Sequence, residues 1–220
     1  MFSWFLPSPA GGRVINRPAS ADCLASPPVP RGDESPRTRR PTKDELAAAI
    51  DKRIPDVIAP DLRIVFCGIN PGLYSGAVGH HFARPGNRFW KVLHRAGLTE
   101  RELSPFEDRD LLQYGIGVTN LVNRTTAAAA ELDHAELRRG ARHLERKVRR
   151  YRPSFVAFAG MGAYRVAFRR PRASLGRQTE TLGESVIWLL PNPSGAQAAY
   201  QPDDLVRAFR ALRRAASRAA

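Results

Sequence analysis

The stretch that decides the fold is IVFCGINPG, at residues 64–72. Four apolar residues rich in β-formers run into a turn made of glycine and proline, with the single amide side chain of Asn70. A strand that ends in such a turn, followed by a polar loop and a helix, is how α/β enzymes build a site at a strand's carboxyl end. Glycine and proline weaken a buried strand, so we interpret this turn as shaped for function rather than for packing.

Three further segments share the short, apolar character of buried parallel strands, and helical patterns lie between most of the four. The predicted strands are residues 62–67, 117–122, 155–159 and 186–190. The predicted helices are residues 87–96, residues 133–151 and a C-terminal helix that begins at Asp203. The alternation indicates an α/β fold, a three-layer α/β/α domain with a short, mainly parallel central sheet of about four strands.

The first 41 residues differ in composition from the rest of the chain. They are rich in proline, serine, arginine and glycine without a sustained period, which is typical of a disordered basic tail. Residues 42–45, TKDE, then have the form of a capping box. We therefore expect the first helix to begin there, and a single folded domain to extend over residues 42–220.

The chain is strongly basic, with 35 lysines and arginines against 21 acidic residues and a formal net charge of +14. This excess indicates a polyanionic partner, most simply nucleic acid, although an arginine-rich genome also produces it. The predicted helix 133–151 is rich in arginine and presents either a solvated face or a phosphate-facing surface. The two cysteines suggest no disulfide framework, and no apolar run is long enough to span a membrane.

A second Pro/Gly turn follows the last predicted strand. It reads PNPSG at residues 191–195 and carries the amide of Asn192. The carboxyl ends of parallel strands lie at the same edge of a sheet. We therefore expect Asn70 and Asn192 to face one cleft.

Five motifs together resemble the mismatch-specific uracil-DNA glycosylases and their thymine-DNA glycosylase relatives. They are GINPG at 68–72, GHHF at 79–82, PGNRFW at 85–90, YGIGVTN at 114–120 and PNPSG at 191–195. The resemblance extends over about residues 61–212, the whole predicted domain. More widespread uracil-DNA glycosylases carry an acidic residue in the first turn and a histidine in the second, where this chain has Asn70 and Asn192.

The resemblance implies a monofunctional enzyme that hydrolyses the N-glycosidic bond of uracil in G·U mispairs, with thymine and other damaged pyrimidines as further substrates to test. It implies double-stranded DNA as the partner, a monomer without cofactor, metal or membrane contact, and a place in the bacterial cytoplasm. A non-catalytic nucleic-acid-binding module with the same fold is the alternative. A small-molecule hydrolase is disfavoured because the chain has no nucleophile elbow.

Asn70 matches the family's amide that positions the water for attack on C1′ of the sugar. An amide is no base at neutral pH, but it can orient a water, and orientation with electrostatic stabilisation suits an oxocarbenium-like transition state. The alternative is an amide that only bonds the backbone of its own turn. Were Asn70 dispensable, Asp108 or Asp110 would be the next candidate for the base.

The resemblance also implies a set of residues around the flipped base. Phe82 stacks on the base or packs in the core. Asn120 offers a donor and an acceptor to the pyrimidine edge, and Ser75 lies near C5 of uracil or is an ordinary loop serine. His81 bonds a phosphate or the water, or is buried by local hydrogen bonds. The predicted substrate-binding set is Ile69, Ser75, His81, Phe82, Asn120 and Asn192.

The second turn departs from the family pattern. Family members usually carry a bulky wedge and an arginine after the glycine that matches Gly195, and these fill the gap left by the flipped base. Residues 196–198 are Ala-Gln-Ala instead, so we expect a weaker hold on the flipped state. Arg88, at the start of a predicted helix, contacts a phosphate or forms a surface ion pair. The predicted DNA-binding set is Arg88, Pro193, Ser194, Gly195, Ala196 and Gln197.

Overall fold

The computed structural model describes residues 40–195 and 199–218. The chain divides into two units, Met1–Ser35 and Pro36–Ala220, and every described residue belongs to the second. All but the last two residues of the predicted tail lie outside the described part, and so do residues 196–198 of the second turn.

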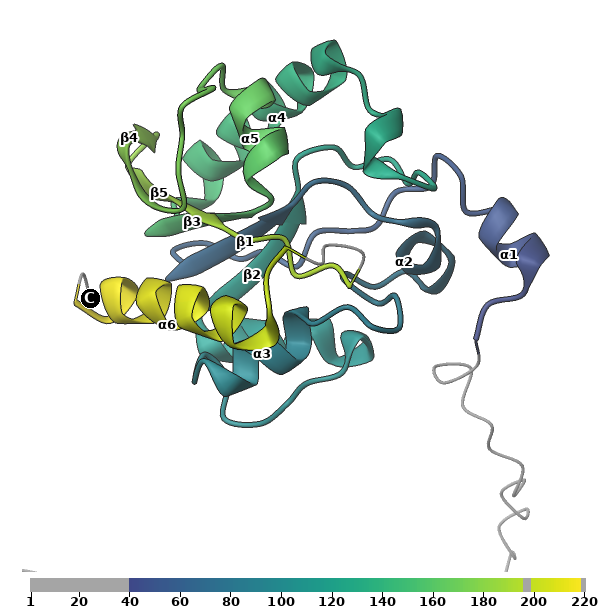
Figure 1. The fold of residues 1–220 in the computed structure, drawn as a ribbon, viewed down its shortest axis with the longest axis horizontal. Coiled ribbons are helices and arrows are strands. Elements are labelled where there is room, and N and C mark those ends of the chain that lie inside the picture. Colours follow the sequence, from purple (N-terminus) through teal and green to yellow (C-terminus); the bar gives the residue numbers. More distant parts are fainter. Residues whose placement is uncertain (1–39, 196–198, 219–220) are drawn as a thin grey trace, which may run out of the picture. The chain divides into compact units, whose positions relative to one another are not determined.

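Five strands form the central sheet, in the order β2-β1-β3-β5-β4 (Figure 1). Four of them run parallel: β1 (Ile64–Gly68), β2 (Ile116–Asn120), β3 (Phe155–Ala159) and β5 (Ser185–Leu190). Every residue of β1, β2 and β3 is buried, as their continuous apolar runs predict for strands covered on both faces. The predicted α/β fold with a mainly parallel sheet is confirmed.

The fifth strand, β4 (Gly176–Leu182), was not predicted from the sequence. It pairs antiparallel with β5 at the edge of the sheet, and Gly183 in the connecting turn has a φ of +62°. Residues of β4 alternate between half-buried and exposed until the buried Leu182. An edge strand with one solvated face needs no apolar run, so β4 lacks the signal that marks the other four strands.

Helices cover both faces of the sheet and create two apolar cores (Figure 1). One core lies against α3 and α6, where the Phe66 ring is 5.3 Å from Phe89 and 5.5 Å from Phe209 between centroids. The other core lies against α4 and α5. The helices are α1 (Lys43–Ala47), α2 (Leu73–Val78), α3 (Phe89–Arg95), α4 (His134–Tyr151), α5 (Met161–Ala167), α6 (Pro202–Arg218) and the 3₁₀ helices η1 (Pro105–Tyr114) and η2 (Ala129–Glu131).

Local sequence signals explain where α1 begins and where α3 ends. The Thr42 hydroxyl accepts from Glu45 N at 3.2 Å, and the Glu45 carboxylate accepts from Thr42 N at 2.7 Å, so the predicted capping box starts α1. Gly97, with a φ of +75°, follows the end of α3 as predicted. Within the described residues, no helix is both long and apolar enough to cross a membrane.

Candidate active site

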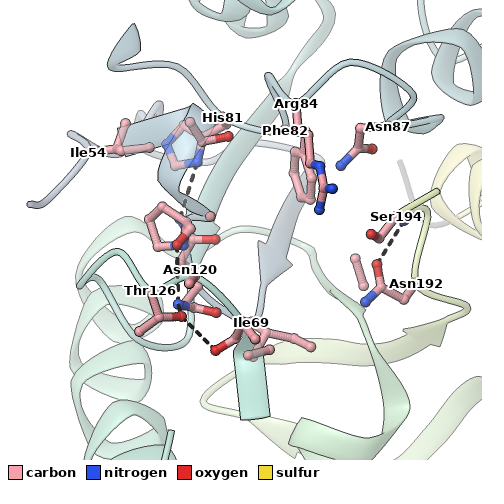
Figure 2. A pocket seen from close by; sticks show the side chains of 18 residues that line it. Ile54, Ile69, His81, Phe82, Arg84, Asn87, Asn120, Thr126, Asn192 and Ser194 are labelled. Carbon is pink, nitrogen blue, oxygen red and sulfur yellow. Dashed lines mark hydrogen bonds between the residues drawn. The ribbon is translucent and has the colours of Figure 1, made fainter. Parts of the chain in front are cut away.

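The segments after β1, β2 and β5 line a cavity of about 320 Å³ at the carboxyl edge of the sheet (Figure 2). The turn after β1 contributes Asn70, the turn after β5 contributes Asn192, and β2 ends in Asn120. Asn87, just before α3, adds a fourth amide. Among the described residues, no carboxylate lines the cavity. Four amides, together with the guanidinium of Arg84 and no acid, suit a ligand that both donates and accepts hydrogen bonds and carries no positive charge.

Asn70 is held by its amide nitrogen. Nδ2 donates to Thr126 Oγ1 at 2.7 Å, and to the carbonyl oxygens of Pro71 and Arg124, each at 3.2 Å. The Thr126 hydroxyl gives its own proton to Ala128 O at 2.8 Å, so it can only accept from Asn70, and this fixes the orientation of the amide. No described residue donates to Asn70 Oδ1. That oxygen is therefore the acceptor which the turn offers to a water or a ligand.

A buried histidine fixes the second amide, Asn120. His81 Nε2 lies 3.0 Å from Pro55 O, which only accepts, so Nε2 carries the proton. Burial lowers the pKa of His81 and favours the neutral ring, whose Nδ1 accepts from Asn120 Nδ2 at 3.3 Å. Both ring nitrogens thus have protein partners. Of the two roles predicted for His81, this geometry favours local hydrogen bonding over contact with a phosphate or the water.

Gly68 lets two side chains of the cavity approach the main chain. A Cβ at this position would lie 2.5 Å from Asn120 Oδ1 and 3.4 Å from Phe82 Cζ. The half-buried Phe82 ring stacks on Phe89, with centroids 4.0 Å apart and planes 21° apart, and it also lines the cavity. Its position is compatible with both predicted roles, because one part of the ring packs in the core and another is left for a planar ligand.

Two more residues of the predicted substrate-binding set line the same cavity. Ser75, in α2, is buried, and its Oγ accepts from Ala83 N at 3.0 Å. Ile69 packs against Gly160, where an added Cβ would lie 3.1 Å from the Ile69 side chain. These contacts set the shape of the cavity on their side before any ligand enters.

The second turn is closed by its own amide. Asn192 Oδ1 accepts from Ser194 N at 2.9 Å, which is the bonding pattern of an Asx turn. At Gly195 an added Cβ would lie 2.7 Å from Gly86 O, so this turn packs on the loop before α3. Asn192 and Ser194 line the cavity, whereas Pro193 and Gly195 do not. The predicted DNA contacts of this turn stay predictions.

Arg88 has several hydrogen-bond partners within the protein. Its guanidinium donates to the carbonyl oxygens of Pro193, Ser194 and Tyr200, at 3.3, 3.0 and 2.7 Å. Its backbone N–H also donates to Pro193 O, at 3.1 Å. These three N–H groups bind the loop after β5, and the predicted contact of Arg88 with a DNA phosphate stays a prediction. Arg88 therefore holds Pro193, Ser194 and Tyr200 of that loop against the start of α3.

The carboxylates proposed as substitutes for Asn70 lie elsewhere. Asp108 is buried, with Oδ2 3.1 Å from His80 Nδ1, and Asp110 pairs with Arg101 at 3.0 Å. Neither lines the cavity. That one of them would be the next candidate for the base, were Asn70 dispensable, stays a prediction.

Thr126 is a site residue that sequence reasoning missed. It anchors the Asn70 amide from the irregular segment between β2 and η2, more than fifty positions along the chain. Residues 125–130 read TTAAAA and carry no motif. The link depends on an isolated parallel bridge between Gly72 and Thr126, which no local pattern announces.

Two comparisons relate this cavity to known proteins. The model of the Uracil DNA glycosylase superfamily matches residues 55–213, which include every lining residue except Ile54. The structure is also similar to the solution NMR structure of a candidate uracil DNA glycosylase from Methanosarcina acetivorans, with a TM-score of 0.50 and 18% identity. The match covers 74% of this chain and 99% of that one. At this identity the likeness concerns the fold.

Proposed function

Since the chain belongs to the Uracil DNA glycosylase superfamily, we propose that it is a monofunctional glycosylase that removes uracil from G·U mispairs in double-stranded DNA. The observation that carries this proposal is an amide in the first turn, Asn70, anchored so that only its oxygen remains to accept. The five motifs of the mismatch-specific branch and the net charge of +14 support it further. We also propose that it acts as a monomer without a cofactor in the bacterial cytoplasm.

Hydrolysis replaces the base at C1′ of the deoxyribose with water. Asn70 Oδ1 accepts a hydrogen bond from that water and directs the water oxygen toward C1′. The C1′–N1 bond breaks, its electron pair leaves with uracil, and the new C–O bond forms. The proton of the water passes to the uracil anion or to solvent, because a neutral amide does not take it. The contribution of the site is preorganisation, and Thr126 supplies it by holding the amide in one orientation.

Asn120 would read the edge of the flipped base. His81 holds one N–H of this amide, so the other N–H and Oδ1 meet a pyrimidine in a single orientation. Uracil presents a matching N3–H donor beside a carbonyl acceptor, whereas cytosine presents the opposite order. Phe82 would stack on the ring, and Ser75 would lie near C5.

A cleavage panel tests the proposal. Single-turnover reactions on U·G, U·A and T·G duplexes and on single-stranded uracil DNA are resolved as strand breaks after alkali. We expect the fastest release from U·G. Equal rates on U·G and U·A would overturn the mismatch preference. Release from no substrate, with DNA binding retained, would overturn the activity and leave a non-catalytic binding module. Gln113→Ala, an exposed amide in η1, is the matched control for variants of Asn70.

A further inference from the structure

A second cavity, of about 460 Å³, adjoins the first. Gly72, Arg84 and Ala127 line both of them, so the two cavities meet along this wall. Among the described residues, no acid lines the second cavity. Its other lining residues are Arg40, Leu46, Leu73, Tyr74 and Pro85.

One wall of this second cavity comes from residues that precede the family match. Arg40 and Leu46 belong to the segment that enters and forms α1, whereas the superfamily model begins at residue 55. The main chain after α1 is fixed to the site: Asp51 N donates to Thr125 O at 3.0 Å, and Thr125 N donates to Lys52 O at 2.9 Å. The segment is therefore attached next to Thr126, and it adds a wall that the family match does not contain.

The chemistry of the second cavity is cationic and aromatic. Arg40 and Arg84 are both exposed, and no described side chain forms an ion pair with either. This sets them apart from Arg124, which pairs with Glu136. Tyr74 is half-buried in the same lining and has no ring partner among the described residues. Guanidinium groups bind phosphate oxygens, and an aromatic ring stacks on a nucleobase.

We propose that the second cavity is a subsite for the nucleotide that adjoins the flipped one on the same DNA strand. Arg84 lines both cavities and so lies where the strand passes from one to the other, which places it on the phosphodiester between the two nucleotides. Arg40 adds a second cation, and Tyr74 stacks on the neighbouring base. The inference rests on the proposed function, because the first cavity must hold the flipped nucleotide.

The test couples removal of a base from the DNA with removal of the ring from the protein. Duplexes carry a 2′-fluorinated deoxyuridine opposite guanine, which resists hydrolysis, and a tetrahydrofuran spacer in place of the base on its 5′ or its 3′ side. At one of these two positions, the spacer should weaken the affinity of the wild type for the duplex. The same spacer should weaken the affinity of Tyr74→Leu about 10-fold less, because this variant has no ring to stack on the missing base. Tyr74→Phe keeps the ring and should behave as the wild type. Equal spacer effects in wild type and Tyr74→Leu would overturn the subsite.

The arginines are tested by salt dependence. Arg84→Met should lower the slope of log Kd against log salt by about 1, because one phosphate contact is lost. Arg172→Met, which removes an exposed arginine in the loop after α5, should leave the slope unchanged. An unchanged slope for Arg84→Met would overturn its phosphate contact.

Two controls distinguish a strand subsite from a mononucleotide site and from a loss of the proposed function. Competition by free deoxynucleoside monophosphate at micromolar concentration would show a mononucleotide site and overturn the strand subsite, whereas no competition supports it. Uracil release by the wild type from an unmodified U·G duplex is measured in the same series. Its absence overturns the proposed function. Its presence without coupling between Tyr74 and the spacer overturns the subsite alone.

Discussion

The two Pro/Gly turns at the edge of the sheet each carry an asparagine, but the protein bonds opposite ends of the two amides. After β1, the nitrogen of Asn70 is bound by protein acceptors and no described residue donates to its oxygen. After β5, the oxygen of Asn192 is bound by Ser194 N. On the proposal that a water is positioned through an acceptor, the first turn is the one whose amide oxygen has no donor among the described residues. The comparison teaches that the role of an amide depends on which of its two ends the fold leaves available.

The anchors of the two turns differ as well. Thr126 holds Asn70 from within the cavity lining, whereas Arg88 holds the second turn from outside it. Replacement of Thr126 should lower the rate of the chemical step, and replacement of Arg88 should lower the affinity for DNA. Rate constants at saturating enzyme and equilibrium affinities separate these two outcomes.

The largest effect is expected for Asn70→Ala. Loss of a preorganised polar group typically lowers the rate about 10²-fold or more, so single-turnover uracil release should fall by that factor. Duplex affinity should change little, because no phosphate contact is removed. The measurement is a rate constant at saturating enzyme beside an equilibrium titration, with Gln113→Ala as control. A variant as fast as the wild type would remove Asn70 from the mechanism.

Acid should disable the amide at the end of β2. Burial lowers the pKa of His81 in the native state, whereas the unfolded chain binds this proton at about 6.5. The contribution of the neutral His81 to the free energy of unfolding is therefore fully present above about pH 6.5. It decreases as the pH falls below this value, because the unfolded state then binds more protons than the native state. Protonated Nδ1 cannot accept from Asn120, so uracil release should decrease roughly tenfold per pH unit below the native pKa.

Urea melts and single-turnover rates between about pH 5 and 8 check this dependence. His81→Gln removes the titrating ring and should flatten the stability profile in this range. Wild-type stability that stays constant down to pH 5, or that rises on acidification, would contradict the neutral histidine.

Arg88→Met should act on binding rather than on chemistry. It leaves the carbonyl oxygens of Ser194 and Tyr200 without the guanidinium donor, whereas Pro193 O keeps the backbone N–H of residue 88. Affinity for duplex DNA should therefore decrease about 10-fold, since an unmade hydrogen bond to a charged group costs about 1.5–3 kcal/mol. The slope of log Kd against log salt should stay unchanged, because we expect the side chain to serve the loop rather than a phosphate. A slope lower by about 1 would restore the DNA contact that the sequence predicted.

The smallest effect is expected at Asn192. Asn192→Ser keeps a short side-chain acceptor for Ser194 N and should leave the rate of uracil release within about twofold of the wild type. Thermal melts should show the same near-identity. A loss of about 10²-fold in this variant would give the second turn a role in the chemical step and abolish the contrast between the turns.

The sequence predicts those strands of the sheet that are buried on both faces. Residues 155–159 form a strand with the predicted bounds, because a strand covered on both faces must be apolar throughout. The sequence does not predict β4, because one of its faces is solvated and its residues, GRQTETL, are mostly polar. The shared edge of the two turns followed from the parallel order, which is a property of the whole sheet and not of either motif.

The partners of side chains were less predictable than their positions. Asn70 and Asn192 look alike in sequence, yet their opposite states depend on Thr126 and Ser194, one distant and one adjacent. For Arg88 the sequence predicts a DNA contact, because an arginine in a basic chain favours that interpretation, and it does not predict the bonds to the loop after β5. Its carbonyl partners lie more than a hundred positions away, where no local pattern points to them.

The most direct measurement is the ratio of two single-turnover rate constants, for Asn70→Ala and Asn192→Ala, on the same U·G duplex. Saturating enzyme removes the contribution of binding, so the ratio reports the chemical step alone. We predict that Asn70→Ala is slower than Asn192→Ala by at least about 20-fold. Equal rate constants, or a slower Asn192→Ala, would contradict the assignment of the water-positioning oxygen to the first turn.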